Sequence, residues 1–236
     1  MHILAIDTST RSCSAALIED QNLRAELTID IGDTHSKHLM AMIDQVTGVA
    51  NVNIANVDGF AVTRGPGTFT GLRIGLGTVK GLALALDKPV VGVSSLEALA
   101  VQACGTHLIC SLIDARREQV YCRCYRCKDN EIAKPCTSER VCSLQEAIAS
   151  IDESVMFIGS GALLYASHIR ARLGSLARFA ACFQHTIRAS TVALIGRERL
   201  LNGDIEDIVG FVPAYLRKSD AELNLEKLNN ARQAEN

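Results

Sequence analysis

Two short polar turns in this sequence could hold a phosphate group. The first, Asp7-Thr8-Ser9-Thr10, follows an apolar run and offers a carboxylate and hydroxyls; the second, Gly159-Ser160-Gly161, separates an apolar run from a helical pattern. The first turn lacks a glycine that would let backbone amides approach a phosphate closely. A single strand–glycine–helix junction such as the second usually serves packing. The nucleotide signal is therefore weak, and we expect neither an intrinsic cofactor nor tight ATP binding by the isolated chain.

Other residue types that perform catalysis are incompletely assembled. His35 and His38 could share a ligand with Asp33, but a zinc hydrolase needs a third protein ligand and an activating carboxylate, and His-Glu-x-x-His is absent. Ser94 and Ser95 lack the Gly-x-Ser-x-Gly elbow of a nucleophilic serine and suit helix capping. We therefore predict no catalytic residue and no metal site, with one histidine packed at a helix interface and the other solvated.

Nine cysteines are present, and Cys122, Cys124 and Cys127 form a cluster. Structural zinc sites show two closely spaced ligand pairs, which this pattern does not reproduce. On a strand, Cys122 and Cys124 would point to the same face, so we predict free, inward-facing thiols. The sequence alone assigns no role to the cluster.

Composition limits the possible partners of the chain. Its 236 residues are 48% hydrophobic and only 4% aromatic, with a formal net charge of −2. We see no signal peptide and no uninterrupted apolar stretch of the roughly 18 residues that a membrane span needs, so we expect a cytoplasmic protein without a membrane partner. The near-neutral charge argues against strong, autonomous binding to nucleic acid.

The pattern of apolar residues predicts an α/β protein in two units. The first opens with strands near residues 3–7, 14–19 and 24–30 and a helix from Asp33 or Thr34 to about Gly48. A strand, a Gly65-Pro66-Gly67 turn and a long helix follow, then a strand and a helix ending near Ala103. The second unit repeats a β-rich opening followed by strand–helix segments. The predicted helices there cover residues 143–151, 163–173 and 190–201. We therefore expect domains at 1–103 and 104–218, with a charged helix at 219–236 packing back on the first.

The long helix at residues 70–87 carries an unusual set of glycines. Gly71 and Gly75 lie on one line and Gly77 and Gly81 on another, although each costs about 1 kcal/mol relative to alanine in a helix. The remaining positions are apolar around almost the whole circumference, which indicates burial on more than one side. The sheet can cover one side. A closely approaching helix, possibly from a second chain, can cover the other; a central core helix of a single domain is the alternative.

Four motifs together resemble the bacterial TsaB (YeaZ) family. They are Ile3-Leu4-Ala5-Ile6-Asp7-Thr8-Ser9-Thr10, Arg64-Gly65-Pro66-Gly67-Thr68-Phe69-Thr70-Gly71-Leu72-Arg73, Asp114-Ala115-Arg116-Arg117-Glu118 with Val120-Tyr121, and Tyr215-Leu216-Arg217. The resemblance implies a two-domain actin-like/sugar-kinase-like (ASKHA) fold with duplicated mixed-sheet domains. It also implies a non-catalytic subunit for threonylcarbamoyladenosine synthesis in tRNA, with TsaD as direct partner, TsaE as a further component and tRNA reached through the complex.

The same resemblance predicts which metal ligands this chain lacks and which residues contact its partner. TsaD-like proteins hold a catalytic metal with His-x-x-x-His on the helix where this chain has Ser95 and Leu99; neither side chain replaces an imidazole ligand. The helices at residues 34–48 and 70–87 are expected to meet TsaD, or a second copy of the chain, in a helical bundle. The expected interface residues are His35, Leu39, Met42, Ile43, Val46, Gly71, Ile74, Gly75, Thr78 and Leu82.

Two other functions remain open at this stage. A stand-alone ATP-dependent kinase or transferase would use Asp7-Thr8-Ser9-Thr10, and a glycoprotease-like metallopeptidase would need the metal ligands that are missing. A nucleotide at the interface with TsaD and self-association of the isolated chain also stay open.

Overall fold

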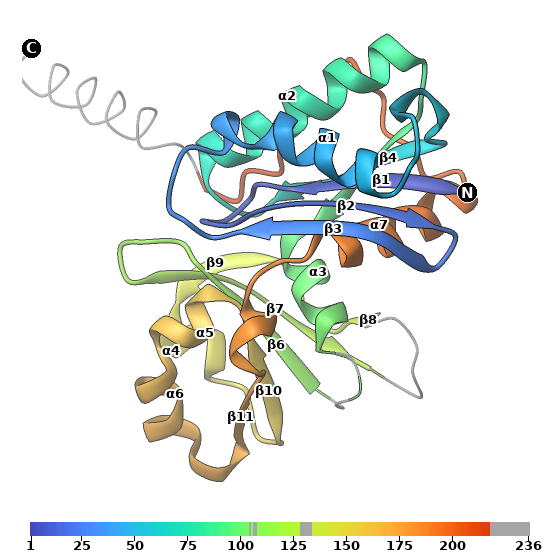
Figure 1. The fold of residues 1–236 in the computed structure, drawn as a ribbon. Helices are drawn as coiled ribbons and strands as arrows, with labels where there is room; N and C mark the ends of the chain where they lie inside the picture. Colours follow the sequence, from blue (N-terminus) through green and yellow to red (C-terminus); the bar gives the residue numbers. More distant parts are fainter. Residues whose placement is uncertain (104, 106–107, 128–133, 218–236) are drawn as a thin grey trace, which may run out of the picture.

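Two mixed β-sheets, one in each half of the sequence, organise the fold (Figure 1). The computed structural model describes residues 1–103, 105, 108–127 and 134–217. The tail at 219–236, expected to be a helix on the first domain, lies outside these residues.

The first sheet has the order β3-β2-β1-β4-β5. Its strands are β1 (His2–Asp7), β2 (Cys13–Glu19), β3 (Asn22–Ile29), β4 (Gly59–Gly65) and β5 (Val90–Ser94). The first three form an antiparallel meander, whereas β4 and β5 run parallel to β1. The central strands are apolar on both faces because helices cover both sides of the sheet.

The second sheet has the order β11-β10-β6-β7-β8, and β9 also pairs with β7. Its strands are β6 (Leu108–Asp114), β7 (Gln119–Arg126), β8 (Lys134–Pro135), β9 (Arg140–Ser143), β10 (Val155–Ile158) and β11 (Ala177–Phe179). The short strands β8 and β9 were not predicted from the sequence. Neither has the length or alternation that identifies a strand without its partner.

Helices pack in three layers around the sheets (Figure 1). The outer face of the first sheet carries α1 (Leu39–Val49) and α2 (Phe69–Leu86), and its other face carries α3 (Ser95–Gln102) and α7 (Ala189–Leu201). The outer face of the second sheet carries α4 (Leu144–Ile148), α5 (Ser160–Leu164) and α6 (Ala166–Leu173). Short 3-10 turns lie at His35–Lys37, Ile54–Asn56, Gly174–Leu176 and Cys182–His185.

Helix α7 packs on the first sheet although its residues fall within the range 104–218 assigned to the second domain. Gly196 lies against Ala61 of β4, where an added Cβ would overlap the alanine. Glu26 of β3, whose side chain is 4% exposed, accepts hydrogen bonds from the amide and hydroxyl of Ser190 at the start of α7. It also forms an ion pair with Arg188. The chain therefore returns to its first half before it ends.

Two predicted helices have different limits in the structure. The helix expected from Asp33 or Thr34 begins only at Leu39, after a 3-10 turn, and the Thr34 side chain caps no backbone amide. The helix expected at 163–173 is two helices, α5 and α6, which meet at Tyr165. Among the described helices, only α2 has the length and hydropathy of a membrane span, and a third of its residues are buried inside the protein.

Candidate functional site

The start of α2 is fixed by the turn that precedes it. The Oγ1 atom of Thr68 accepts a hydrogen bond from the amide of Gly71 at 3.2 Å, so Thr68 is the N-cap of α2. The helix ends where Asp87 adopts a left-handed conformation with φ +52°. These two ends give α2 its full length along the sheet.

One line of glycines in α2 faces the chain itself. A Cβ on Gly71 would overlap the carbonyl oxygen of Thr8, and one on Gly75 would overlap the Thr8 hydroxyl. That hydroxyl donates to the carbonyl of Gly71 at 2.7 Å. The expected interface role of Gly71 and Gly75 is thus corrected: they admit the chain's own first hairpin, because glycine spacing predicts a close neighbour but not which one.

The apolar stripe of α1 is also internal. Its four members are buried to at least 97% and belong to the core between α1, α2 and the first sheet: Leu39, Met42, Ile43 and Val46. A stripe at helical spacing contacts the nearest apolar surface, and here that surface is the sheet of the same chain. These residues lie beneath the exposed face of α1 and do not form its surface.

The histidines before α1 lie at its edge. His35 is half-buried, and its Nε2 atom is 2.9 Å from the carbonyl oxygen of Thr10. His38 is half-buried too, with its Nε2 atom 3.3 Å from Asp33. The hydrogen bond from Lys37 lowers the pKa of the Asp33 carboxyl to about 2, with further contributions from Thr34 and His38. Each imidazole therefore has a partner from this chain.

The other line of glycines in α2 is open to solvent. Added Cβ atoms on Gly77 and Gly81 would have no neighbour within 4 Å. Large apolar side chains are exposed on the same side of the sheet: Met40 (53%), Val49 (82%) and Leu84 (64%). We call these five residues the α1–α2 surface. Ile74, Thr78 and Leu82 of the expected interface are half-buried.

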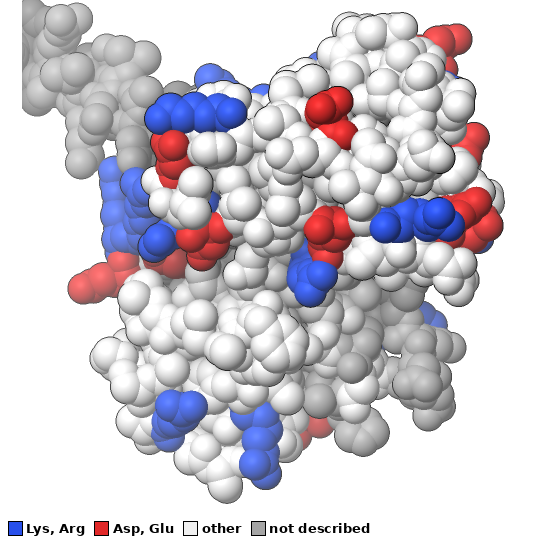
Figure 2. All heavy atoms as spheres, viewed as in Figure 1, with Lys and Arg blue, Asp and Glu red and all other residues white. Residues whose placement is uncertain are grey.

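Charge is sparse over the two helices that carry this surface. Figure 2 shows the region of α1 and α2 as mostly neither basic nor acidic. An apolar, glycine-lined helix face allows the backbone of another helix to approach closely. The α1–α2 surface is the candidate functional site of this chain.

The turn after β1 is closed to a phosphate group. Oδ1 of Asp7 accepts hydrogen bonds from the Ser9 hydroxyl at 2.6 Å and the Thr63 hydroxyl at 2.7 Å, and burial raises the pKa of this carboxyl. The amide of Thr68 donates to the carbonyl of Ser9 at 2.7 Å, and Gly67 touches the same carbonyl. The start of α2 thus covers the turn.

The residues of this turn are almost inaccessible to solvent. Asp7, Thr8 and Ser9 are fully buried. Thr10 is half-buried, and its hydroxyl lies 3.0 Å from that of Ser12.

The turn after β10 serves packing in the same way. Gly159 has φ +102°, and its amide donates to Nδ1 of the buried His185 at 3.1 Å. Gly159 and Gly161 lie against the backbone of β6, where side chains would overlap or crowd. Ser160 is exposed, and its hydroxyl accepts from the amide of Asp114 at 3.1 Å.

No cluster of three or more His, Cys, Asp or Glu side chains suited to a metal ion is found in the part of the chain that the structure describes. Ser95 and Leu99, which stand at the positions of a metal-binding histidine pair in the resemblance, are buried in α3. The Ser95 hydroxyl has no hydrogen-bond partner there.

The cysteines form thiol pairs across the second sheet. Cys110 lies opposite Cys124 in the β6–β7 register, and the Sγ atoms of Cys122 and Cys142 are 3.5 Å apart. The hydrogen bond between the Cys110 and Cys124 thiols lowers the pKa of Cys124 to about 7. The buried thiol of Cys122 agrees with the prediction, whereas Cys124 is only half-buried. The contact with Cys142 was missed because β9 was missed.

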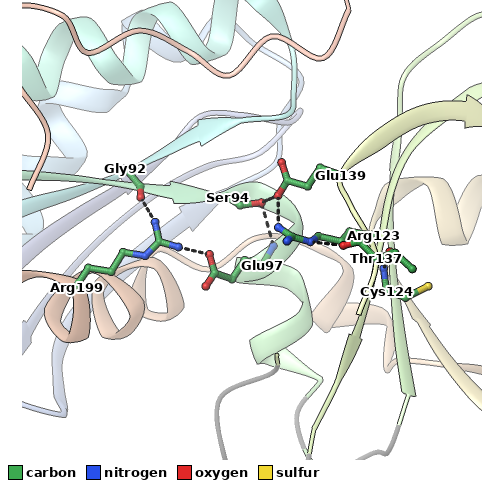
Figure 3. Close-up of polar contacts among 8 residues, drawn as sticks. All are labelled: Gly92, Ser94, Glu97, Arg123, Cys124, Thr137, Glu139 and Arg199. Carbon is green, nitrogen blue, oxygen red and sulfur yellow. Dashed lines mark hydrogen bonds and ion pairs between the residues drawn. The ribbon is translucent and has the colours of Figure 1, made fainter. Parts of the chain in front are cut away.

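A polar network joins the two halves of the molecule (Figure 3). Glu139, from the segment before β9, accepts from the Ser94 hydroxyl and forms an ion pair with Arg123 of β7 at 3.2 Å. Nearby, Arg199 of α7 pairs with Glu97 of α3 at 2.6 Å. These partly buried contacts hold α3 and the second sheet in a fixed relation to the first.

Comparison with known proteins identifies the family. The family model described as "TsaD: tRNA N6-adenosine threonylcarbamoyltransferase" matches residues 30–225. A Bacillus subtilis protein named "tRNA threonylcarbamoyladenosine biosynthesis protein TsaB" is 34% identical over 227 residues, covering 94% of this chain and 96% of that protein. Its Escherichia coli namesake is 36% identical over 135 residues, covering 56% of this chain and 58% of that protein.

Solved structures agree with the sequence relatives. YeaZ from Pseudomonas aeruginosa superposes with a TM-score of 0.79 at 30% identity, covering 91% of this chain and 99% of that chain. Component A of the (R)-2-hydroxyglutaryl-CoA dehydratase of Acidaminococcus fermentans, at 11% identity and a TM-score of 0.52 over 85% of this chain and 99% of its own, shares the fold alone. The two-domain actin-like fold expected from the sequence is confirmed, and the chain belongs to the TsaB family.

Proposed function

We propose that this protein is an accessory subunit for synthesis of threonylcarbamoyladenosine in tRNA, and that it binds and activates TsaD through the α1–α2 surface. The observation that carries the proposal is an exposed apolar helix face, lined by Gly77 and Gly81, on a member of the TsaB family. Helices that meet over glycine gain close van der Waals contact along the backbone. TsaD, which the resemblance names as partner, is the occupant that we assign to this face.

The chain acts in this proposal by contact and not by chemistry of its own. Ser95 and Leu99 cannot hold the metal that TsaD-like proteins bind at those positions. The Asp7-Thr8-Ser9-Thr10 turn is filled by the chain's own α2, which argues against a stand-alone kinase or transferase. A nucleotide would then belong to the complex, at its interface.

The remaining partners follow from the same assignment. TsaE joins as a further component, tRNA is reached through the complex, and the chain works in the cytoplasm. When TsaD is absent, the same apolar surface is the place where two copies of the chain would associate as a homodimer, since water leaves that face in either pairing.

Reconstitution tests the proposal. Purified TsaD, TsaE and unmodified tRNA are incubated with ATP and a threonylcarbamoyl donor, either with this chain or with buffer in its place. The modified adenosine is then quantified by mass spectrometry. We expect modification to depend on the chain. Equal yield without it, or modification by the chain without TsaD, would overturn the proposal.

A further inference from the structure

Four thiols lie on the outer face of the second sheet, and the proposed function uses none of them. They are Cys110 of β6, Cys122 and Cys124 of β7 and Cys142 of β9, all within one core cluster. In the part of the chain that the structure describes, no three such ligands are grouped as a metal ion requires. The sulfurs are arranged in pairs, and the chemistry available to a pair of thiols is oxidation to a disulfide.

Cys110 and Cys124 have the backbone placement that a disulfide needs. They are direct partners in the antiparallel β6–β7 register. Directly opposite residues have Cα atoms about 4.5–5.5 Å apart, within the roughly 4.4–6.8 Å that disulfides span. Cys122 and Cys142 are instead diagonal neighbours, although their sulfurs are 3.5 Å apart. Diagonal Cα atoms lie about 7–8 Å apart, so the first pair can be bridged with less backbone movement.

The surroundings of Cys124 favour its thiolate form. Hydrogen bonds from the Cys110 thiol and the Thr137 hydroxyl, together with the positive charge of Arg140, lower the pKa of Cys124 to about 7. The Oγ1 atom of Thr137 accepts from the Cys124 amide at 2.9 Å, so the hydroxyl keeps its own proton for the sulfur (Figure 3). Cys124 is half-buried, so a small oxidant can reach it. Partly exposed cysteines beside a positive charge are the reactive ones in proteins.

Cys110 is suited to the step that follows oxidation of Cys124. Its side chain is 1% exposed, so it is shielded from an oxidant in solution. The hydrogen bond to Cys124 and burial raise the pKa of Cys110 well above its usual range, so it remains a neutral thiol. A neutral thiol brings the proton that a leaving hydroxide needs to depart as water.

Cys142 is a natural comparison for Cys124. It is also half-buried and lies on the same face of the sheet. Burial and the hydrogen bond with Cys122 raise the pKa of Cys142 to about 12. Its thiolate fraction at neutral pH is therefore about 10⁴–10⁵-fold smaller than that of Cys124. The greater nucleophilicity of a more basic thiolate offsets only part of this difference, about half on a logarithmic scale.

We propose that Cys124 and Cys110 form a reversible redox site, with Cys124 as the thiolate that reacts with a hydroperoxide and Cys110 as the thiol that resolves the product. The Cys124 sulfur attacks one peroxide oxygen; an S–O bond forms, the O–O bond breaks, and the alkoxide or hydroxide leaves and takes a proton from water. Cys124 is then a sulfenic acid. The Cys110 sulfur attacks the Cys124 sulfur, an S–S bond replaces the S–O bond, and hydroxide leaves with the Cys110 proton as water. Two thiols are oxidised by two electrons, and one peroxide is reduced.

Peptide mapping of the full chain, without TsaD, tests the site. The protein is reduced, freed of reductant, treated with a small excess of hydrogen peroxide and quenched by alkylation at successive times. Trypsin cuts after Arg123, which places Cys122 and Cys124 on different peptides. We expect the first disulfide to join Cys110 to Cys124 and to be reversed by dithiothreitol. Cys124 should be oxidised at least about tenfold faster than Cys142.

Matched serine variants separate the two roles. Cys110→Ser removes the resolving thiol, so the sulfenic acid of Cys124 should accumulate and be trapped by dimedone, whereas wild type should give little adduct. Cys124→Ser should lower the rate of disulfide formation at least about tenfold. Cys142→Ser, on a neighbouring strand, is the control and should oxidise at the wild-type rate. A purely structural role for Cys110 would not produce the dimedone adduct.

Several outcomes would overturn the inference. They are a first disulfide between Cys122 and Cys142 or between Cys124 and Cys136, oxidation of Cys124→Ser as fast as wild type, or no dimedone adduct in Cys110→Ser. Thermal melting checks the fold of each variant. If Cys110→Ser does not fold, the wild-type peptide map and the rates of Cys124→Ser and Cys142→Ser decide. Because TsaD is not present, failure here leaves the proposed function untouched.

Discussion

The four glycines of α2 perform two different tasks. Gly71 and Gly75 make room for Thr8 of the same chain, whereas Gly77 and Gly81 face open space. In the sequence the two lines look equivalent, because helical spacing encodes which residues share a line but not what covers it. Only the tertiary structure separates the structural pair from the pair available to a partner.

Alanine substitutions distinguish the two tasks. Gly75→Ala should lower the free energy of unfolding by about 2 kcal/mol or more, because its Cβ overlaps the Thr8 hydroxyl. Gly77→Ala should raise it by about 0.5–1 kcal/mol, because the new methyl meets nothing and helix propensity improves. Urea unfolding of both variants measures the difference, and equal effects would contradict the assignment.

The buried Asp7 makes stability depend on pH. Burial raises its pKa above 3.8 in the folded chain, so the folded state holds this proton more tightly than the unfolded state. Its contribution to stability is complete below the unfolded-state pKa and is lost as the pH rises through the folded-state pKa.

Asp7→Asn should remove this dependence. We expect the variant to gain stability relative to wild type as the pH rises from about 4 to 8, with a slope of at most about 1.4 kcal/mol per pH unit. Denaturant titrations across this range test the difference. A difference that stays constant or moves in the opposite direction would contradict the raised pKa.

At the scale of elements, most helices and strands were predictable, and their packing was not. The Thr68 and Ser94 caps and the main strands follow from local residue pattern. Leu39, Met42, Ile43 and Val46 were expected at a partner interface, but they are buried against the sheet of the same chain. The break at Tyr165 and the short strand β9 depend on contacts with other elements, which local sequence does not contain.

A charge on the outer line of α2 should block partner binding without unfolding the chain. Gly81→Arg adds a long cation to the α1–α2 surface at a position where an added Cβ has no neighbour within 4 Å. We expect at least about tenfold weaker binding of TsaD by calorimetry. Leu164→Glu, at a 58% exposed position of α5, is the matched control and should bind as wild type.

At the scale of the whole molecule, the chain closes on itself through contacts that no local pattern reveals. Helix α7 returns to the first sheet, and Glu139 joins Ser94 of the first half to Arg123 of the second. A cavity beside Tyr215 is likewise lined by three distant segments, from residues 66–70, 114–121 and 214–217. The family resemblance predicted the two-domain fold, but the sequence could not predict which charged residues meet between the halves.

Removing Glu139 should loosen this junction. Glu139→Ala leaves the half-buried Arg123 without its carboxylate, and we expect a loss of about 1–3 kcal/mol in the free energy of unfolding. Glu153→Ala breaks the exposed pair with Arg126 and should cost about 0.2–1 kcal/mol. Chemical denaturation compares the two, and an equal loss would show that the junction does not depend on Glu139.

The central claim is that the chain acts through the α1–α2 surface when it binds TsaD. Hydrogen–deuterium exchange of the chain with and without TsaD tests this most directly, because it reports which backbone amides the partner covers or stabilises. The account predicts slower exchange concentrated in α1 and α2. Unchanged exchange in both helices, with protection confined to the second sheet and its helices, would contradict it.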